Sequence, residues 1–467
     1  MHFTHLVRWR RLPKRSALCF APSQRFSSLK TFSDLGLDDR IISGLKDMNI
    51  TTPTGIQAKT IPLILARQET LLCAAQTGTG KTLAYLTPVI EHILRAEAVA
   101  KTDVVPSRPG ALILLPSREL ALQVASIAKT LSHAAKFASC SITSGERKSI
   151  QQKKLARRLD LVIGTPGRVA KCIASSDFFL SRLHTIVIDE ADTLLDAKMG
   201  FRQQVDAVVG PIQTSAAKRK QGLQVILAAA TMRSPLDQVV KKKFPNLRIV
   251  SDEKIHQTPR NIQQEFRRVT PESKHSALRE ALRSRRQPTA KTMVFCRNAA
   301  SVRSTEHMLR EHGFQETVCL HGDMPLARRQ DAIEAFSKDT AVSILVCTDL
   351  AARGLDFDAV KHVLMFDFPK TAIDYVHRAG RTGRAGDDGH VTSLVTKHDL
   401  ALARSIQNSK RDNRTMKQLR QGVATSFAVQ RTASNSSRMK QQGRDSCPTL
   451  GRGTKKLPRH KIRTPRV

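Results

Sequence analysis

Short apolar runs, separated by longer stretches with helical spacing, are the feature that most limits what this chain can fold into. The runs are continuous and not alternating, which is typical of strands buried on both faces of a parallel sheet. They predict an α/β fold in which helices cover a parallel sheet. The runs occupy residues 70–75, 111–115, 138–143, 161–164, 185–188 and 223–229.

A second series of such runs follows a polar, proline-containing stretch at residues 252–261, DEKIHQTPRN. This stretch has the composition of a linker. We therefore expect two tandem parallel-sheet domains, residues 31–251 and 262–407, with a cleft between them. The second series occupies residues 262–269, 291–296, 316–320, 342–347, 362–367 and 390–395.

The two ends of the chain differ from the middle. Residues 1–30 carry seven Lys and Arg and no acid, and residues 408–467 carry sixteen against two acids. The second segment is too poor in apolar residues to offset the entropy of ordering, so we expect a disordered basic tail. The first has the composition of an organellar transit peptide, which predicts the mitochondrial matrix, with plastid or nucleolus as alternatives. A disordered basic arm that binds RNA is the other interpretation of residues 1–30.

Overall composition restricts the class of partner. A net charge of +37 and a pI near 10.6 favour a polyanionic partner, although a solvated basic surface has the same composition. The eight cysteines include no CxxC pair, so we expect reduced core residues and neither a zinc site nor a disulfide framework. No apolar run approaches the roughly 20 residues that cross a bilayer, so no membrane span is expected.

A glycine-rich segment, AQTGTGKT, follows the first apolar run and precedes a helical pattern. Glycines let backbone N–H groups surround phosphate oxygens at a helix N-terminus, although a plain strand-to-helix turn is the alternative. A P-loop here would place Lys81 at the β- and γ-phosphates and the Thr82 hydroxyl on Mg²⁺. The predicted nucleotide-binding residues of this loop are Ala75, Gln76, Thr77, Gly78, Thr79, Gly80, Lys81 and Thr82.

An acidic cluster, residues 189–192, directly follows the apolar run TIVI in this basic chain. Crowded carboxylates indicate either a bound cation or an exposed helix start. In P-loop folds a carboxylate at the end of a neighbouring strand holds the same Mg²⁺ as the loop. We therefore predict Asp189 and Thr82 as magnesium ligands, with Glu190 orienting or deprotonating the attacking water.

Ten short motifs follow one another in order across both predicted domains. They are NITTPTGIQ (49–57), AQTGTGKT (75–82), PSRELA (116–121), Gly145, TPGR (165–168), DEAD (189–192), VFCRN (294–298), HGDM (321–324), TDLAARGLD (348–356) and HRAGRTGR (377–384). In the order and spacing of these motifs, the sequence from residue 32 to about 407 resembles the DEAD-box RNA helicases. The resemblance implies two RecA-like domains and an ATP-dependent RNA helicase, with the Q motif region at residues 30–58.

The resemblance also implies roles around ATP and Mg²⁺. Phe32 would stack on the adenine, Gln57 would bind its edge and Asp356 would hold the ribose. Arg381 and Arg384 would act as arginine fingers, and join Lys81, Asp189 and Glu190 as the catalytic residues. Residues implied to couple the two sites are Thr231, Asp192 and His377.

RNA is the implied partner, and the resemblance implies that the protein binds its sugar-phosphate backbone and makes no sequence-specific contacts to the bases. Closure of the domains would bend one strand and locally unwind a short duplex. We expect a monomer without a membrane association, whose further partners are ribosomal particles or an ATPase-modulating protein. The RNA-contacting residues implied are Arg118, Thr165, Gly167, Arg168, Arg329, Thr348 and Arg353.

Several positions depart from the family pattern. Ala229 replaces a serine that links the acidic and arginine motifs, and Leu326 replaces an RNA-contacting glutamine. Asn49-Ile50 and Ser144-Gly145 stand in place of Gly-Phe and Gly-Gly. These departures favour an alternative, an RNA-clamping assembly factor with a weak or uncoupled ATPase, while a DNA-directed helicase is a third candidate. No residue specifies which RNA is bound.

Overall fold

A computed structural model gives the fold of this chain. All of the residues it describes belong to one compact unit. The expectations for residues 1–30 and most of those for residues 408–467 lie outside the described residues, as do those for Thr77, Thr231, Arg353, Asp356 and the linker residues 252–260. The described residues are 31–411, apart from 67–69, 77, 101–105, 197–199, 219–221, 231–239, 241–242, 245–246, 252–260, 286–288, 353–354, 356, 358–359 and 385–386.

The first lobe is built on a seven-stranded parallel sheet with the order β3-β4-β2-β5-β6-β1-β7. All six predicted strands are present. The seventh was not predicted, because only one of its five residues is fully buried and it lacks a continuous apolar run. The strands are β1 (Thr70–Ala74), β2 (Ala111–Leu114), β3 (Ser139–Ile142), β4 (Leu161–Gly164), β5 (Thr185–Ile188), β6 (Gln224–Ala229) and β7 (Leu247–Ser251).

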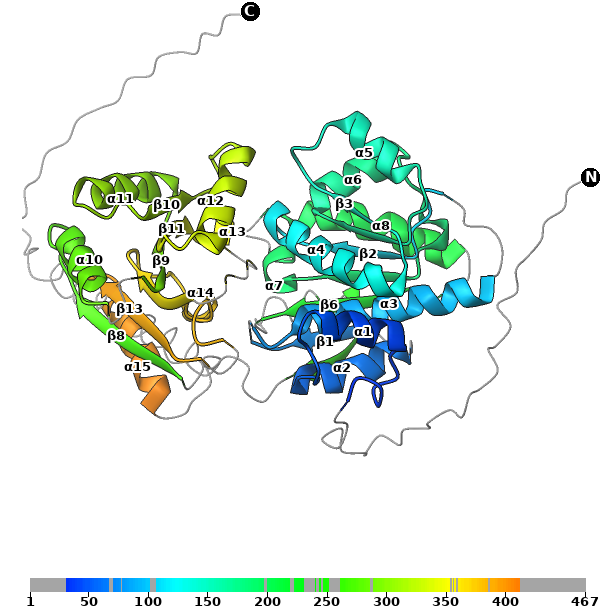
Figure 1. The fold of residues 1–467 in the computed structure, drawn as a ribbon, viewed down its shortest axis with the longest axis horizontal. Helices are drawn as coiled ribbons and strands as arrows, with labels where there is room; N and C mark the ends of the chain where they lie inside the picture. The colour runs from blue at the N-terminus through cyan, green and yellow to red at the C-terminus, as the bar shows by residue number, and fades with distance from the viewer. Residues whose placement is uncertain are drawn as a thin grey trace, which may run out of the picture. The chain divides into compact units, whose positions relative to one another are not determined.

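Helices cover both faces of this sheet (Figure 1). Neighbouring residues of one strand enter different cores: Leu71 packs with α1 to α4, whereas Leu72 packs with α5 to α8. This burial on both faces explains the continuous apolar runs. The helices are α1 (Asp39–Asp47), α2 (Gly55–Leu65), α3 (Lys81–Ala100), α4 (Arg118–Ala135), α5 (Lys148–Leu155), α6 (Pro166–Ala174), α7 (Ala191–Leu194) and α8 (Arg202–Lys218).

The second lobe has a six-stranded parallel sheet with the order β10-β11-β9-β12-β13-β8. Its strands are β8 (Ile262–Arg268), β9 (Lys291–Cys296), β10 (Thr317–Leu320), β11 (Ile344–Thr348), β12 (Val360–Met365) and β13 (Gly389–Val395), in the places predicted. Its helices are α10 (Lys274–Arg283), α11 (Ala299–Glu311), α12 (Leu326–Lys338), α13 (Asp349–Ala352), α14 (Ala372–Ala379) and α15 (Leu400–Arg411).

Two boundaries differ slightly from the prediction. Helix α15 continues to Arg411, past the expected domain end at residue 407. Asn261, assigned to the linker, donates from Nδ2 to the Gly383 carbonyl at 3.2 Å and so belongs to the second lobe. Among the described helices none is long and apolar enough to cross a membrane. The six described cysteines are free; five of them are buried and Cys319 is half-buried.

Strand order decides which loops can meet. In a parallel sheet the segments that follow the strands gather along one edge, where ligands bind. Strands β5, β6 and β1 are neighbours, so the P-loop after β1 lies near the acidic cluster after β5. Strands β3, β4 and β2 form the other half of the sheet, so the motifs that follow them collect together.

Candidate nucleotide site and nucleic-acid cleft

The P-loop connects β1 to the first residue of α3. Gly78 and Gly80 have φ angles of +81° and +85°, a left-handed conformation that glycine adopts at little cost. Lys81 donates from Nζ to the carbonyls of Ala75 at 2.7 Å and Gln76 at 2.5 Å. Burial lowers the pKa of Lys81. The loop thus holds a cationic side chain at its own centre, where the phosphates of a nucleotide would bind.

The Q motif is bound directly to this loop. Gln57, 1% exposed, accepts from the Thr54 N–H at 2.8 Å and donates from Nε2 to the Gly80 carbonyl at 3.1 Å. The Thr54 hydroxyl donates to the Thr79 carbonyl at 2.8 Å. Thr54 and Gln57 also form the capping box that begins α2. The same two side chains therefore start a helix and fix the P-loop.

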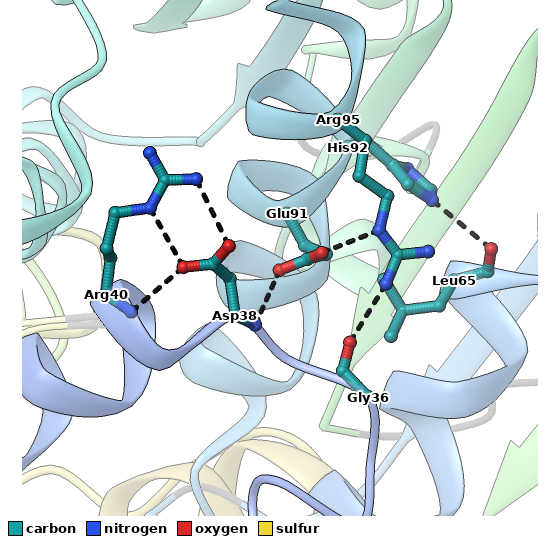
Figure 2. A network of polar contacts seen from close by, with 7 residues as sticks. All are labelled: Gly36, Asp38, Arg40, Leu65, Glu91, His92 and Arg95. Carbon is teal, nitrogen blue, oxygen red and sulfur yellow. Dashed lines mark hydrogen bonds and ion pairs between the residues drawn. The ribbon is translucent and has the colours of Figure 1, made fainter. Parts of the chain in front are cut away.

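Figure 2 shows how the segment before the Q motif is attached to α3. One carboxylate oxygen of Glu91 accepts from the Asp38 N–H at 2.8 Å, and the other accepts from Arg95 Nε at 2.6 Å. Arg95 also donates to the Gly36 carbonyl at 2.9 Å. The side chains of Glu91 and Arg95 on α3 thus hold the main chain of residues 36–38.

Phe32 lies just before this segment, and its side chain is 2% exposed within the core. Its proposed role in stacking on adenine stays a prediction.

The acidic cluster is buried. Asp189 accepts from the Tyr85 hydroxyl and from the Glu190 N–H, both at 2.8 Å. Asp189 and Asp192 are 6% and 5% exposed, and burial raises the pKa of Asp189 and of Glu190. A short helix does begin at Ala191, but the interpretation of the cluster as an exposed helix start is wrong.

The cluster fits the magnesium ion that the P-loop implies. In the described part of the chain, Glu190 Oε2 is buried without a hydrogen-bond donor. A buried carboxylate oxygen without a donor is costly unless a cation balances it. Carboxylate and hydroxyl oxygens are the ligands that Mg²⁺ prefers. Asp189 and the Thr82 hydroxyl are the residues that would hold it.

Three basic side chains of the second lobe reach this site. His377 Nε2 lies 3.4 Å from Asp192 Oδ2. Arg381, 4% exposed, donates to the Leu355 carbonyl at 2.7 Å, and its charge acts to lower the pKa of Glu190, against the larger effect of burial. Arg384 packs so closely on the P-loop that its Cγ would be 3.2 Å from a Cβ placed on Gly78. Burial lowers the pKa of Arg384 to about 10.

A cavity of about 810 Å³ lies along the other half of the sheet edge. Arg118 begins α4 after β2, and its Nε and Nη1 atoms are buried without an acceptor in the described residues. A guanidinium with unused donors is suited to a phosphate. Five predicted RNA-contacting residues line this cavity: Arg118, Thr165, Gly167, Arg168 and Arg329.

Neighbouring side chains position two of these arginines. Arg168 donates from Nε to Gln151 Oε1 at 2.7 Å, and Arg329 Nη1 lies 3.3 Å from Glu119 Oε1. Thr348 ends β11 and does not line the cavity. The cavity also includes residues that sequence reasoning missed: Lys171, Phe201, Gln203 and Gln204.

Spacing could have indicated one of the missed residues. Lys171 follows Gly167 and Arg168 by four and three positions on α6, which places it on the same helix face. Leu326, where the family pattern has a glutamine, contacts the Gly145 turn: its Cδ1 would lie 2.0 Å from a Cβ placed on Gly145. Gly145 has a φ of +87°, so a larger residue there would also be strained.

The P-loop lies beside buried carboxylates and receives arginines from a second lobe, and the neighbouring cleft contains guanidinium donors without an acceptor in the described residues. These features are typical of a nucleotide-dependent enzyme that acts on a polyanion. The model of the DEAD/DEAH box helicase family matches residues 54–239, and that of the helicase conserved C-terminal domain matches residues 273–386. The chain belongs to the DEAD-box ATP-dependent RNA helicases.

Relatives from plants, animals and bacteria share most of this chain. It is 36% identical to DEAD-box ATP-dependent RNA helicase 39 of Arabidopsis thaliana over 89% of its own length, and spans 66% of that protein. Identity is also 36% to the probable ATP-dependent RNA helicase DDX28 of Mus musculus, over 86% of this chain and 77% of that one. CshA of Geobacillus kaustophilus is 34% identical over 83% and 79% of the two chains.

Solved structures confirm the two RecA-like lobes. S. cerevisiae Dbp5 bound to RNA and ADP BeF3 superposes with a TM-score of 0.70 at 26% identity, over 81% of this chain and 93% of that one. Mss116p bound to ssRNA and AMP-PNP superposes with a TM-score of 0.74 at 26% identity, over 84% and 80%.

Proposed function

We propose that this helicase binds one RNA strand by its backbone and uses MgATP-driven closure of its lobes to separate short duplexes. The observation that carries the proposal is the placement of Arg381 and Arg384, from the second lobe, against the acidic cluster and the P-loop of the first. Because the nucleotide site is completed by both lobes, ATP favours their closure by differential contacts.

Each part of the nucleotide site has a role in the proposed hydrolysis. The P-loop backbone and Lys81 bind the phosphates, and Asp189 and Thr82 would hold a Mg²⁺ ion, which would neutralise charge on them. Glu190 accepts the proton of the attacking water. Arg381 and Arg384 stabilise the charge of the transferring phosphoryl group, an effect worth about 10³–10⁵ in rate in enzymes of this kind.

Base recognition belongs to the Q motif and residues beyond it. We propose that Gln57 binds the edge of the adenine, and the bonds that its amide makes to Thr54 and to the Gly80 carbonyl of the P-loop support a position beside the nucleotide. We propose that Phe32 packs against the adenine and that Asp356 holds the ribose. Thr231, Asp192 and His377 would transmit closure to the RNA side, and the contact between Asp192 and His377 supports this.

On the RNA side, the arginines that line the cavity of about 810 Å³ would bind phosphates while the lobes are closed. Arg118 offers donors that make no hydrogen bond within the described residues, and Gln151 orients Arg168. Thr165, Gly167, Arg329, Thr348 and Arg353 complete the proposed backbone contacts. Such contacts hold a strand without specifying its sequence.

A mitochondrial location is proposed from residues 1–30, which are rich in arginine and free of acid. Ribosomal particles or an ATPase-modulating protein are the partners we propose there. Fusing residues 1–30 to a fluorescent reporter tests the location. Import into the matrix is expected, and a plastid or nucleolar signal would refute it.

ATPase activity with and without single-stranded RNA tests the function. RNA should stimulate hydrolysis of ATP, and the wild type should unwind a short duplex. Glu190→Gln should lower the ATPase rate at least 100-fold, because the base that accepts the proton is lost, while nucleotide and RNA still bind.

The control measures nucleotide affinity and RNA affinity of Glu190→Gln beside the wild type. Absence of RNA stimulation, or an unchanged rate in Glu190→Gln, rejects the helicase mechanism. Tight nucleotide-dependent RNA binding with a very slow wild-type ATPase would instead select the RNA-clamping assembly factor. Equal stimulation by DNA and RNA would select a DNA-directed enzyme.

A further inference from the structure

A second, smaller cavity of about 350 Å³ adjoins the nucleic-acid cleft and lies wholly in the first lobe. It shares two lining residues, Arg118 and Gly145, with the larger cavity. Arg118, with buried donors that make no hydrogen bond in the described structure, therefore faces both. The two cavities thus adjoin each other at Arg118 and Gly145. Helix α5 and the turn before it form the far wall of the smaller cavity, through Glu146, Arg147, Ile150 and Lys154.

Topology places α5 at the end of the nucleic-acid half of the sheet. Strand β3 is the edge strand and pairs with β4, which in turn pairs with β2; the loops after β4 and β2 carry proposed RNA contacts. Helix α5 follows β3 and lies near α6 at that end of the lobe (Figure 1). A strand that leaves the larger cavity past Gly145 would therefore meet α5 next.

The surface of α5 has the chemistry of a backbone-binding face. Residues 147–158 contain six Lys and Arg and no acid. Ile150 and Lys154 lie four positions apart on one face of α5, and Arg147 is the N-cap of this helix; all three line the smaller cavity and are exposed. Lys154 is paired with Glu146, whereas Ile150 presents an apolar surface that is 45% exposed. Cations flanking an apolar side chain suit phosphates on either side of a ribose.

The neighbouring face of α5 is fixed to the cleft. Leu155 is fully buried, and Gln151, 1% exposed, accepts from Arg168 Nε at 2.7 Å. Gln152 donates to Asp177 at 2.9 Å. The helix is thus held rigidly beside an arginine of the proposed RNA site, and a rigid cationic face loses little entropy when it binds a strand.

We propose that Arg147, Ile150 and Lys154 form an accessory site for the sugar-phosphate backbone of nucleotides that flank the segment held in the cleft. The inference rests on the proposed RNA-binding function and adds a surface to it. Arg118 marks the junction between the two sites. The accessory site lengthens the strand held by the first lobe alone, before the lobes close.

The test compares RNAs of different length on the full chain. The short RNA is the shortest oligonucleotide that fully stimulates the wild-type ATPase, and the long RNAs extend it by eight nucleotides at the 5′ end or at the 3′ end. Arg147→Gln/Lys154→Gln should weaken binding of one long RNA by about tenfold and lower its salt slope by about 1.4, since each phosphate contact on a single strand contributes about 0.7. Binding of the short RNA and its stimulation of the ATPase should not change.

A matched variant removes the same charge elsewhere: Lys129→Gln/Lys218→Gln, two exposed lysines on α4 and α8. Equal loss in this variant would mean that only net charge matters and would overturn the proposal. Equal loss for short and long RNAs, or no loss for either extension, would overturn it as well. Failure of the wild type to bind any RNA would reject the proposed function itself, a distinct outcome.

Discussion

At the scale of single residues, Glu190 has the most unusual backbone of the candidate site. Its φ of +46° places a non-glycine residue in the left-handed region, which costs of the order of 1 kcal/mol or more. The Glu190 carbonyl accepts from the N–H groups of Thr193 and Leu194, so the helix that follows holds this conformation. The turn directs the Glu190 side chain into a buried site that includes Asp189 and, from the second lobe, Arg381.

The contacts of Glu91 in Figure 2 predict that this side chain stabilises the fold. Glu91→Ala removes the acceptor for the Asp38 N–H and for Arg95, and loss of such buried hydrogen bonds should cost about 1–3 kcal/mol of stability. Because this pair holds the chain next to Phe32, the KM for ATP should also rise, more than that for GTP. Thermal unfolding and steady-state ATPase assays measure the two effects.

Arg40→Ala is the control for Glu91→Ala. Arg40 pairs with Asp38 on the surface, where its side chain is 51% exposed, so its loss should cost below about 1 kcal/mol. A larger destabilisation by Arg40→Ala than by Glu91→Ala would contradict the assignment of Glu91 as the anchor.

At the scale of elements, apolar runs predicted strands well where both sheet faces are buried. Strands β1 to β6 and β8 to β13 all fall within or beside such runs. Strand β7 was not predicted because Arg248 and Ile249 are exposed, so its sequence contains no continuous apolar run. Local pattern records burial, so an edge strand with an open face gives little signal.

The candidate site was predicted less evenly. Motif residues such as Lys81 and Asp189 could be proposed for the nucleotide site because the residue types and the spacing within each motif suit phosphate or metal binding. Phe201 and Gln204 enter the cleft only because α8 packs beside α6, which no local pattern reports. The same holds for the contact between Leu326 and the Gly145 turn.

Strand β12 carries a histidine that makes the second lobe sensitive to acid. His362 bonds to the Thr392 hydroxyl at 2.9 Å, and burial, with the charges of His390, Arg285 and Arg267, lowers the pKa of His362 to about 3. The unfolded chain, with an ordinary histidine pKa near 6.5, binds this proton first. Stability should therefore be complete above about pH 6.5 and fall as pH drops towards 3, by at most about 1.4 kcal/mol per pH unit.

Urea unfolding of the wild type and of His362→Gln at pH 7.5, 6.0 and 5.0 measures this effect. Glutamine can still bond to Thr392 but does not titrate, so its stability should depend less on pH. Parallel pH profiles for the two proteins would show that His362 is not the source.

At the scale of the whole molecule, the nucleotide site depends on contacts that join residues far apart in the chain. The side chains of His377 and Asp192 are 8% and 2% exposed and lie 3.4 Å apart, and removal of one partner from a buried polar contact costs about 1–3 kcal/mol where it has been measured. Because Asp192→Asn keeps a polar group of the same shape, it should lose only part of this free energy. We expect at least tenfold weaker RNA binding in the presence of a nucleotide analogue.

Fluorescence anisotropy with labelled RNA, with and without the analogue, measures that loss. Binding without nucleotide should not change, because it does not require the closed lobes. Asp206→Asn, at a surface pair with Lys243, serves as the control. Equal weakening with and without nucleotide would place Asp192 in RNA binding itself and not in closure.

The order of strands in the first sheet has a consequence for inherited damage to this protein. In the proposed mechanism one half of the ligand edge binds the nucleotide and the other half binds the RNA strand, so harmful substitutions should fall into two groups with different effects. Lesions after β1 or β5 that block hydrolysis but still allow closure, such as Glu190→Gln, should leave a protein that stays bound to its RNA, and should therefore act dominantly. Lesions after β2, β3 or β4 should leave a protein that does not bind its RNA, and should therefore be recessive.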